Sequence, residues 1–311
     1  PGTACAAGSA AGLTSTPHNG RSFAHMRGGR PFCSPRVCSR RRYRRVMVAE
    51  QELTEMAASI ATRAGELARV RRAEGVQIAA TKSALADIVT EADREVEDLI
   101  RGLLAEARPQ DGFLGEESGA ERGTSGITWV VDPIDGTVNY AYGIPSYAVS
   151  IAAVEGEPEP LEWTALSAAV CNPMSGELFT ATRGAGAWLG GVQLHVNDEP
   201  SPAGLLLATG FGYDPAVHAA QFAMLARVMP MARDIRRIGA ASLDLAFVAA
   251  GRLDAYFERG LWPWDHAAGA LLVTEAGGRV GGLDGAAASR DLTVAAAPGV
   301  FDQLVRLIGE R

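Results

Sequence analysis

The spacing of apolar residues changes twice along this chain of 311 residues, and these changes constrain its fold more than any single motif. Over 50–72 and 90–107, apolar residues recur at the three- and four-residue spacing of amphipathic helices. From 112 to about 191 they form short strand-like runs bounded by Gly, Pro and acidic residues. After residue 200, short strands alternate with helices. This order predicts an α/β or α+β sandwich of packed layers.

The expected elements follow from these runs and their end signals. Thr90 is an expected helix N-cap with Asp93 in the capping-box position, and Pro109 ends that helix. The expected strands are 112–118, 127–132, 147–155, 163–172, a hairpin over 176–191, 205–210, 234–239, 253–258 and 292–298. The expected later helices are 215–229, 242–251, 265–278 and 299–309.

The first 46 residues differ in composition from the rest of the chain. Nine of the 29 basic residues and none of the 36 acidic residues lie there, in a stretch rich in Gly, Ser and Pro. We predict a disordered extension over 1–46. It could be an organelle transit peptide, a basic arm for nucleic acid, or upstream sequence from a mis-assigned start before Met47, and we favour the last. Residues 47–311 then form the folded body, with halves at about 47–200 and 201–311.

Charge and cysteine content restrict what the body does. Its 20 basic residues stand against 36 acidic ones, a balance of −16, which disfavours nucleic acid as a partner. An acidic enzyme acting on a phosphate substrate would need metal cations as mediators. No apolar run approaches the roughly 20 residues that span a bilayer. Cys171 is the only cysteine in the body, so a disulfide framework is excluded there and a cytoplasmic location is expected.

Acidic residues lie at the ends of several expected elements rather than on open helix faces. In "WVVDPIDGTVNY" (129–140) two of them flank a proline, and others occur in "GEES" (115–118), after "GLWPW" and in the first turn of the second helix. Carboxylates that converge from different strand ends suit Mg²⁺. Gly136 would let the backbone approach an anion, and Thr137 would begin a helix. The residues concerned are Asp93, Glu116, Glu117, Asp132, Asp135 and Asp265.

Each of these motifs also has a simpler interpretation. Alone, D-P-x-D-G-T is a turn sequence, "GEES" a solvated loop, and Asp265 a helix N-cap. Phosphatases that form an aspartyl phosphate carry two acids spaced two apart, whereas Asp132 and Asp135 are three apart with a proline between them. The chain has no P-loop motif and no G-x-S-x-G motif. A metal site built from several strand ends is therefore favoured.

Five segments in order resemble the inositol monophosphatase family. They are "DIVTEAD" (87–93), "GEES" (115–118), "WVVDPIDGTVNYAYGIPSYAVSIA" (129–152), "GAASLDLAFVAAGRLDAYFE" (239–258) and "WDHAAGALLVTEAGG" (264–278). The resemblance covers roughly 50–310. It implies alternating αβαβα layers, as in fructose 1,6-bisphosphatase, and makes 47–311 a lithium-sensitive, Mg²⁺-dependent catalytic domain.

The resemblance also implies roles for individual residues. Glu116, Asp132 and the Ile134 carbonyl would bind one Mg²⁺, and Asp132, Asp135 and Asp265 a second, with Glu116 serving a weaker third. Asp93 and Thr137 would activate the attacking water, with Glu116 beside them. The substrate would contact Asp135, Gly136, Thr137, Ala241, Glu258 and Asp265. Lys82, the one lysine of the body, and Glu117 would support the metal ligands from behind.

The expected activity is hydrolysis of inositol monophosphate by a metal-activated water, in a homodimer that contacts neither membrane nor nucleic acid. Histidinol phosphate, fructose 1,6-bisphosphate and 3′-phosphoadenosine 5′-phosphate are alternative substrates for the same chemistry. Glu258 favours a polyol, because a carboxylate accepts hydrogen bonds from ring hydroxyls. A regulatory or RNA-associated binding protein is the alternative of another class.

Overall fold

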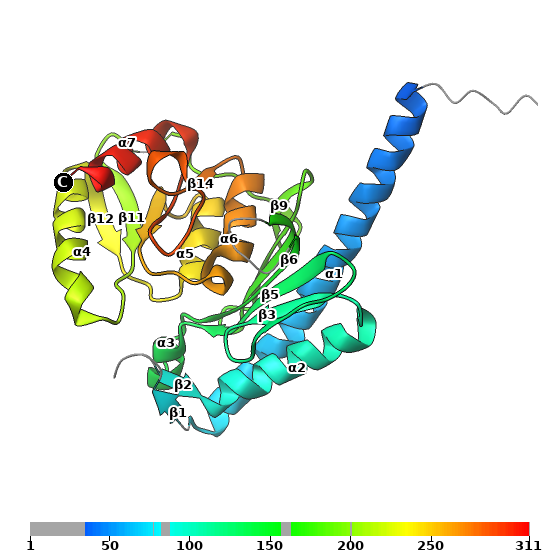
Figure 1. The fold of residues 1–311 in the computed structure, drawn as a ribbon. Coiled ribbons are helices and arrows are strands. Elements are labelled where there is room, and N and C mark those ends of the chain that lie inside the picture. Colours follow the sequence, from blue (N-terminus) through cyan, green and yellow to red (C-terminus); the bar gives the residue numbers. More distant parts are fainter. Residues whose placement is uncertain (1–34, 77, 82–87, 157–162, 200, 311) are drawn as a thin grey trace, which may run out of the picture. The chain divides into compact units, whose positions relative to one another are not determined.

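A computed structural model describes residues 35–76, 78–81, 88–156, 163–199 and 201–310 (Figure 1). Lys82 and residues 1–34 of the predicted extension lie outside these ranges. The chain divides into two compact units, residues 1–41 and residues 42–311. The layers described below belong to the second unit.

Two helices form the first layer, α2 (Glu91–Ala107) and the part of α1 (Pro35–Glu74) that lies in the second unit, residues 42–74. Helix α1 begins at Pro35, inside the stretch 1–46 for which we predicted disorder and well before the predicted helix start at residue 50. Proline suits the first turn of a helix, and the following residues to Glu74 include no further proline and several arginines, which are good helix formers. The end of α2 at Ala107 agrees with the predicted limit.

An eight-stranded sheet forms the second layer, in the order β10-β9-β8-β7-β6-β5-β3-β4. All neighbouring pairs are antiparallel except β3 and β5, which are parallel. The sequence supports this layer with strands that are apolar on both faces, since helices cover both. The strands are β3 (Gly112–Gly115), β4 (Gly119–Glu121), β5 (Ile127–Asp135), β6 (Ala148–Glu155), β7 (Thr164–Asn172), β8 (Glu177–Thr182), β9 (Gly186–Leu189) and β10 (Val192–Gln193). A separate ribbon pairs β1 (Ile78–Thr81) with β2 (Ile88–Thr90).

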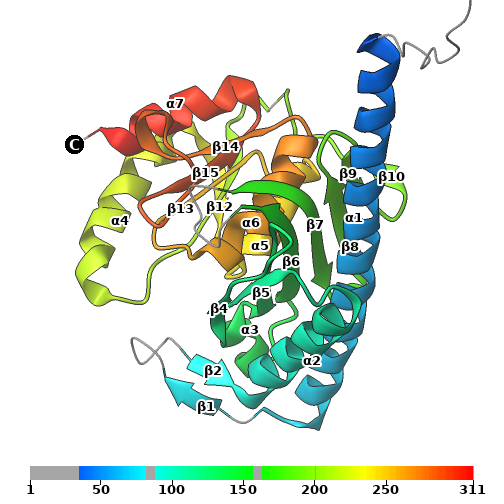
Figure 2. The same cartoon turned by 45° about the vertical axis from the view of Figure 1, so that its right-hand side comes forward.

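The second half adds two helix layers around a five-stranded sheet in the order β12-β11-β13-β15-β14. Figure 2 shows α5 and α6 between the two sheets. The strands of the five-stranded sheet are β11 (Leu205–Thr209), β12 (Ala232–Arg236), β13 (Ala255–Glu258), β14 (Arg279–Gly281) and β15 (Thr293–Ala296). The helices of this half are α4 (Pro215–Val228), α5 (Ala241–Ala249), α6 (Pro263–Glu275) and α7 (Pro298–Gly309), whereas α3 (Thr137–Tyr142) lies in the first half, directly after β5.

Three apolar clusters fill the spaces between these layers. One joins α1 and α2 to the first sheet, the next joins that sheet to α5, α6 and the second sheet, and the third joins the second sheet to α4 and α7. The layer order is therefore αβαβα, and the predicted sandwich is confirmed. Among the described residues, no helix combines the length and apolar character needed to span a membrane.

Candidate active site

Strand β5 brings Asp132 and Asp135 to one site because it carries an extra residue. Asp132 lies opposite Ser150 on β6 and Asp135 opposite Ala148, so three steps along β5 match two along β6. Such a bulge bends a strand and re-aims its side chains. Without it, residues three apart would point to opposite faces of the sheet. The sequence placed the end of this strand at Asp132, but the strand continues to Asp135.

Asp132 is the centre of a group of four carboxylates, of which Asp132 and Asp135 are buried and Glu116 and Asp265 are partly buried. Its side chain is 1% exposed, and its Oδ1 atom has no hydrogen-bond partner. Burial raises the pKa of Asp132 well above its usual value, and the charges of Glu116, Asp135 and Asp265 raise it further. Glu116 also shares a hydrogen bond with Asp132. Carboxylates gathered out of water in this way require protons or cations for compensation.

Asp135 is held by the first turn of α5. Its Oδ2 atom accepts hydrogen bonds from the backbone N–H and the hydroxyl of Ser242, at 2.6 and 2.5 Å. Its Oδ1 atom accepts a hydrogen bond from the N–H of Ala241 at 3.2 Å. Burial raises the pKa of Asp135 to about 6 despite these donors, which favour the ionised form.

Asp265 lies in the first turn of α6, which begins at Pro263 rather than at Asp265 as we predicted. Its Oδ2 atom accepts a hydrogen bond from the Trp262 N–H at 2.6 Å. The Trp262 ring stacks on the Trp264 ring with centroids 5.3 Å apart. The Arg290 guanidinium lies over the Trp262 ring, 3.4 Å from its centroid. This stack fixes the segment that leads into Asp265.

Asp93 and Thr137 face each other across the site. The Thr137 hydroxyl lies 3.2 Å from Asp93 Oδ1 and 3.1 Å from the Ile134 carbonyl oxygen, and it can donate to one of them at a time. Thr90 and Asp93 form the predicted capping box, in which the Thr90 N–H donates to Asp93 Oδ2 at 2.8 Å. Burial raises the pKa of Asp93 to about 7, and Glu116 and Glu117 contribute to this.

Gly136 is the one position of this segment where the backbone requires glycine. Its φ of 92° lies in the left-handed region. A Cβ atom there would lie 3.1 Å from the carbonyl oxygens of Ser146 and Gly239. The chain therefore turns sharply from β5 into α3, and Thr137 begins that helix as predicted.

A second acidic group lies around Glu258, at the end of β13. Its Oε2 atom accepts a hydrogen bond from the Tyr256 hydroxyl at 2.5 Å, and burial raises its pKa to about 7. Asp244 on α5 is buried nearby, with an Oδ1 atom that lacks a hydrogen-bond partner. Burial raises the pKa of Asp244, and the charges of Glu258 and Asp135 add to the effect, whereas Arg237 opposes it.

Sequence reasoning missed several residues of this region. Ser242 fixes Asp135, Tyr256 fixes Glu258, and the buried acids Glu97 and Asp244 lie beside the site. A signal was present for Asp244, since it lies on the otherwise apolar helix α5, where a charge without a function is costly. No comparable signal marks Ser242, because its contact with Asp135 spans 107 positions of the chain.

The donors gathered here fit a hard divalent cation. They are carboxylate oxygens and the Ile134 carbonyl, the ligand types that Mg²⁺ prefers, and Asp132 Oδ1 is a buried oxygen without a partner. Within the described ranges, no three His, Cys, Asp or Glu side chains converge closely enough to form a coordination group. The fit therefore rests on the chemistry and burial of the donors.

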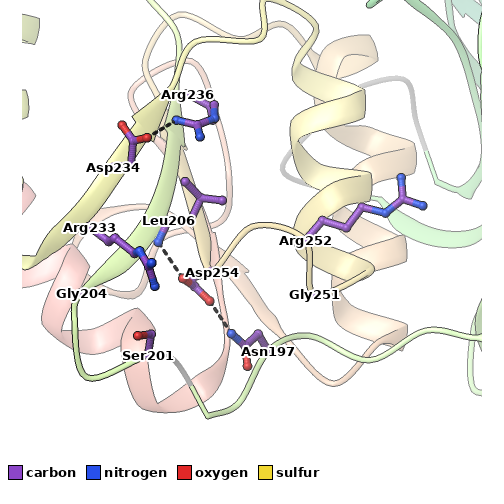
Figure 3. A pocket seen from close by; sticks show the side chains of 10 residues that line it. All are labelled: Asn197, Ser201, Gly204, Leu206, Arg233, Asp234, Arg236, Gly251, Arg252 and Asp254. Carbon is purple, nitrogen blue, oxygen red and sulfur yellow. Dashed lines mark hydrogen bonds and ion pairs between the residues drawn. The ribbon is translucent and has the colours of Figure 1, made fainter.

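A cavity of about 310 Å³ lies away from these carboxylates (Figure 3). It opens at the start of β11, β12 and β13, whereas Glu258 lies at the end of β13. Asp254 in its wall accepts hydrogen bonds from Asn197 Nδ2 at 2.5 Å and from the Leu206 N–H at 2.6 Å. Its polar groups are largely engaged in holding loops, so it stands apart from the candidate site.

Comparison with known proteins connects this geometry to a family. The model of a family described as the inositol monophosphatase family matches residues 49–308. The chain belongs to the inositol monophosphatase family. Membership agrees with the resemblance carried by the five sequence motifs.

Relatives in this family carry two kinds of name. An inositol-1-monophosphatase of Mycobacterium leprae is 43% identical over 277 residues, covering 82% of this chain and 92% of the relative. A protein named Nus factor SuhB of Escherichia coli is 40% identical over 236 residues, covering 75% and 86%. A crystal structure of extragenic suppressor protein suhB from Bartonella henselae superimposes with a TM-score of 0.75 at 35% identity, covering 83% and 99%.

Proposed function

We propose that this chain is a Mg²⁺-dependent phosphomonoesterase that hydrolyses inositol monophosphate to inositol and phosphate. The observation that carries the proposal is the group of Glu116, Asp132, Asp135 and Asp265 next to the Asp93–Thr137 pair, in which burial and then the neighbouring carboxylate charges raise the pKa of Asp132 and Asp265. A phosphatase family and relatives named inositol-1-monophosphatase support it.

The four carboxylates and the Ile134 carbonyl are the proposed metal ligands. Glu116, Asp132 and Ile134 would hold one ion, Asp132, Asp135 and Asp265 a second, and Glu116 would also serve a third. When bound, Mg²⁺ supplies positive charge for the phosphate and lowers the pKa of a coordinated water. This explains how an acidic protein can bind an anionic substrate.

The chain's own groups handle the proton and the substrate. Thr137 would orient the attacking water and pass its proton to Asp93, whose pKa of about 7 suits a base at neutral pH. The N–H groups of Gly136 and Thr137 would hold the phosphate. Glu258, which is oriented by Tyr256, would accept hydrogen bonds from the hydroxyls of a polyol substrate. Ala241 would contact the same part of the substrate.

The test is phosphate release by the metal-stripped full chain, with and without added Mg²⁺. Inositol 1-phosphate, histidinol phosphate, fructose 1,6-bisphosphate and 3′-phosphoadenosine 5′-phosphate form the substrate panel. We expect Mg²⁺-dependent turnover that prefers inositol 1-phosphate, is inhibited by Li⁺, and is lost in Asp132→Asn. If the enzyme prefers another of the four substrates, the proposed mechanism stands and the proposed substrate is wrong. A folded protein that hydrolyses none of the four would reject the enzyme proposal.

A second role, as a regulatory protein that binds RNA, is favoured by one observation, the name Nus factor SuhB borne by several relatives. We propose RNA binding as a function in addition to catalysis. Separately, we expect the enzyme to be a homodimer. Measuring RNA binding by the full chain at increasing salt, and again in the Asp132→Asn variant, separates the two roles. Binding that persists in the inactive variant supports the second role, and no binding at low salt rejects it.

A further inference from the structure

We propose that Glu97 is a positioning residue that sets the place of Glu116, although it does not itself bind the metal. The inference rests on the proposed function, in which Glu116 is a metal ligand. Glu97 lies on α2, is 2% exposed, and is an acid buried without a cationic partner among the described contacts. The cost of burying such a carboxylate must be compensated by hydrogen bonds.

Two consecutive backbone amides provide this compensation. Glu97 Oε2 accepts a hydrogen bond from the Glu117 N–H at 2.8 Å, and Glu97 Oε1 accepts one from the Ser118 N–H at 2.7 Å. On the other side, the Glu116 N–H donates to the Val131 carbonyl of β5 at 3.2 Å. The backbone is therefore tied on both sides of the Glu116 Cα, once to the helix and once to the strand that carries Asp132.

Gly115 makes room for this arrangement. A Cβ atom at Gly115 would collide with the Glu97 carboxylate and with the Phe113 ring. Because Gly115 lacks a positive φ, the requirement for glycine here comes from the close approach of Glu97 and not from backbone conformation. The G-E-E-S segment and Glu97 therefore form one fitted unit.

Helix α2 places this contact in register with the proton-transfer pair. Asp93, Glu97 and Arg101 follow each other at four-residue intervals on one side of the helix. Asp93 faces Thr137, Glu97 binds the two amides, and Arg101 donates to the Ser118 hydroxyl at 2.9 Å. One rigid helix thereby relates the position of the proposed base to the position of Glu116.

This role predicts a measurable effect on metal binding. Residues that hold a metal ligand from behind typically change metal affinity by about 10- to 100-fold when replaced. In Glu97→Gln, one acceptor oxygen becomes an N–H donor opposite a backbone N–H, so one of the two hydrogen bonds is lost. We expect the Mg²⁺ dissociation constant of the full chain, measured by titration calorimetry, to rise about tenfold.

A second measurement does not involve metal. In the metal-free full chain, hydrogen exchange of the Glu117 and Ser118 amides should be about tenfold faster in Glu97→Gln than in the unaltered protein, because opening of the loop becomes easier. Glu95→Gln is the matched control, since it makes the same change on the same helix at an exposed residue paired with Arg71 at 2.5 Å. That variant should change neither measurement by more than about twofold.

Gly115→Ala tests the same contact without a change of charge, and Glu97→Asp replaces Glu97→Gln if the latter does not fold. Both should weaken Mg²⁺ binding and speed exchange at the two amides. A folded variant at Glu97 that binds Mg²⁺ within twofold of the unaltered chain, with unchanged exchange, would overturn the positioning role. If the unaltered chain binds no Mg²⁺, the proposed function fails instead, and the exchange measurement still decides whether Glu97 holds the loop.

Discussion

At the residue scale, the candidate site is shaped by hydrogen-bond donors that are not themselves proposed ligands. Ser242 and Ala241 fix Asp135, and the Trp262 N–H fixes Asp265. Each donor favours the ionised carboxylate, against the effect of burial. The carboxylates are thus directed before any cation binds, which reduces the reorganisation that binding would require.

Thr137→Ala should separate catalysis from metal binding. The hydroxyl that links Asp93 to the site is lost, whereas every proposed metal ligand remains. We expect kcat to fall by about 10²- to 10⁴-fold, the usual contribution of a positioned proton-transfer group. Steady-state kinetics and Mg²⁺ calorimetry on the same sample check this. Unchanged kcat would remove Thr137 from the proposed mechanism, and Thr137→Ser should retain most of the activity.

Ser242→Ala should weaken Mg²⁺ binding less than a change at Glu97. The Ser242 hydroxyl bond to Asp135 at 2.5 Å is lost, but the two backbone donors to Asp135 remain. We expect about a threefold to tenfold rise in the Mg²⁺ dissociation constant, equivalent to about 1 kcal/mol, the typical net contribution of one hydrogen bond. Calorimetry on the metal-stripped chain measures it. An effect as large as that of Asp135→Asn would contradict the supporting role.

The sequence predicted the charged residues of the site better than their supports. Asp132, Asp135 and Asp265 could be selected because acids recur at the ends of several expected elements, and the structure brings them together with Glu116. Lys82 lies outside the described residues. Ser242 and Glu97 could not be selected, because their partners are distant in the chain and neither residue is uncommon on a helix.

At the element scale, the order of helices and strands was predictable and some limits were not. The spacing of apolar residues gave most helices and strands within a few residues, except for the start of α1 and the short strands β1, β2, β4, β10 and β14, which were not predicted. The start of α1 was missed because Gly, Ser and Pro in residues 1–34 dominated the composition of the whole stretch. The extension of β5 to Asp135 was missed because proline usually ends a strand, whereas here it lies in a bulge.

Thr90→Ala should test the capping box of α2. Thr90 is buried, receives the Asp93 N–H at 3.4 Å, and donates to Asp93 through both its N–H and its hydroxyl. We expect the free energy of unfolding to fall by about 1 kcal/mol, the usual value for loss of an N-cap. Denaturant unfolding provides the measurement. Thr62→Ala, which removes an exposed hydroxyl on α1, is the control and should change stability by less than about 0.5 kcal/mol.

At the scale of the whole molecule, the buried acids connect stability to pH and to metal. The pKa is raised to about 7 for Asp93 and about 6 for Asp135, and well above its usual value for Asp132. The folded state therefore binds more protons than the unfolded state between about pH 4 and pH 7. Stability from these groups is complete below their unfolded pKa of about 3.9 and is lost as the pH rises through their folded values.

The Tm of the metal-stripped chain should consequently fall between pH 5 and pH 8, by an amount that Asp132→Asn reduces. Addition of Mg²⁺ at pH 8 should restore the Tm of the unaltered chain, because ligand binding to the folded state stabilises it. Thermal unfolding followed by circular dichroism checks both. Equal pH dependence in the two proteins would show that the Asp132 cluster does not control stability. Glu95→Gln, a change at an exposed acid, should leave the dependence unaltered.

The bulge in β5 also bears on how such a site can change over evolutionary time. Substitutions can replace Asp132 or Asp135 one at a time, but they cannot alter the extra residue that aims both side chains at one point. Removing that residue takes a deletion, which would leave the two acids two positions apart on a regular strand and therefore still on one face. A change from this geometry to two-residue spacing therefore requires a single deletion and cannot be reached by a series of substitutions.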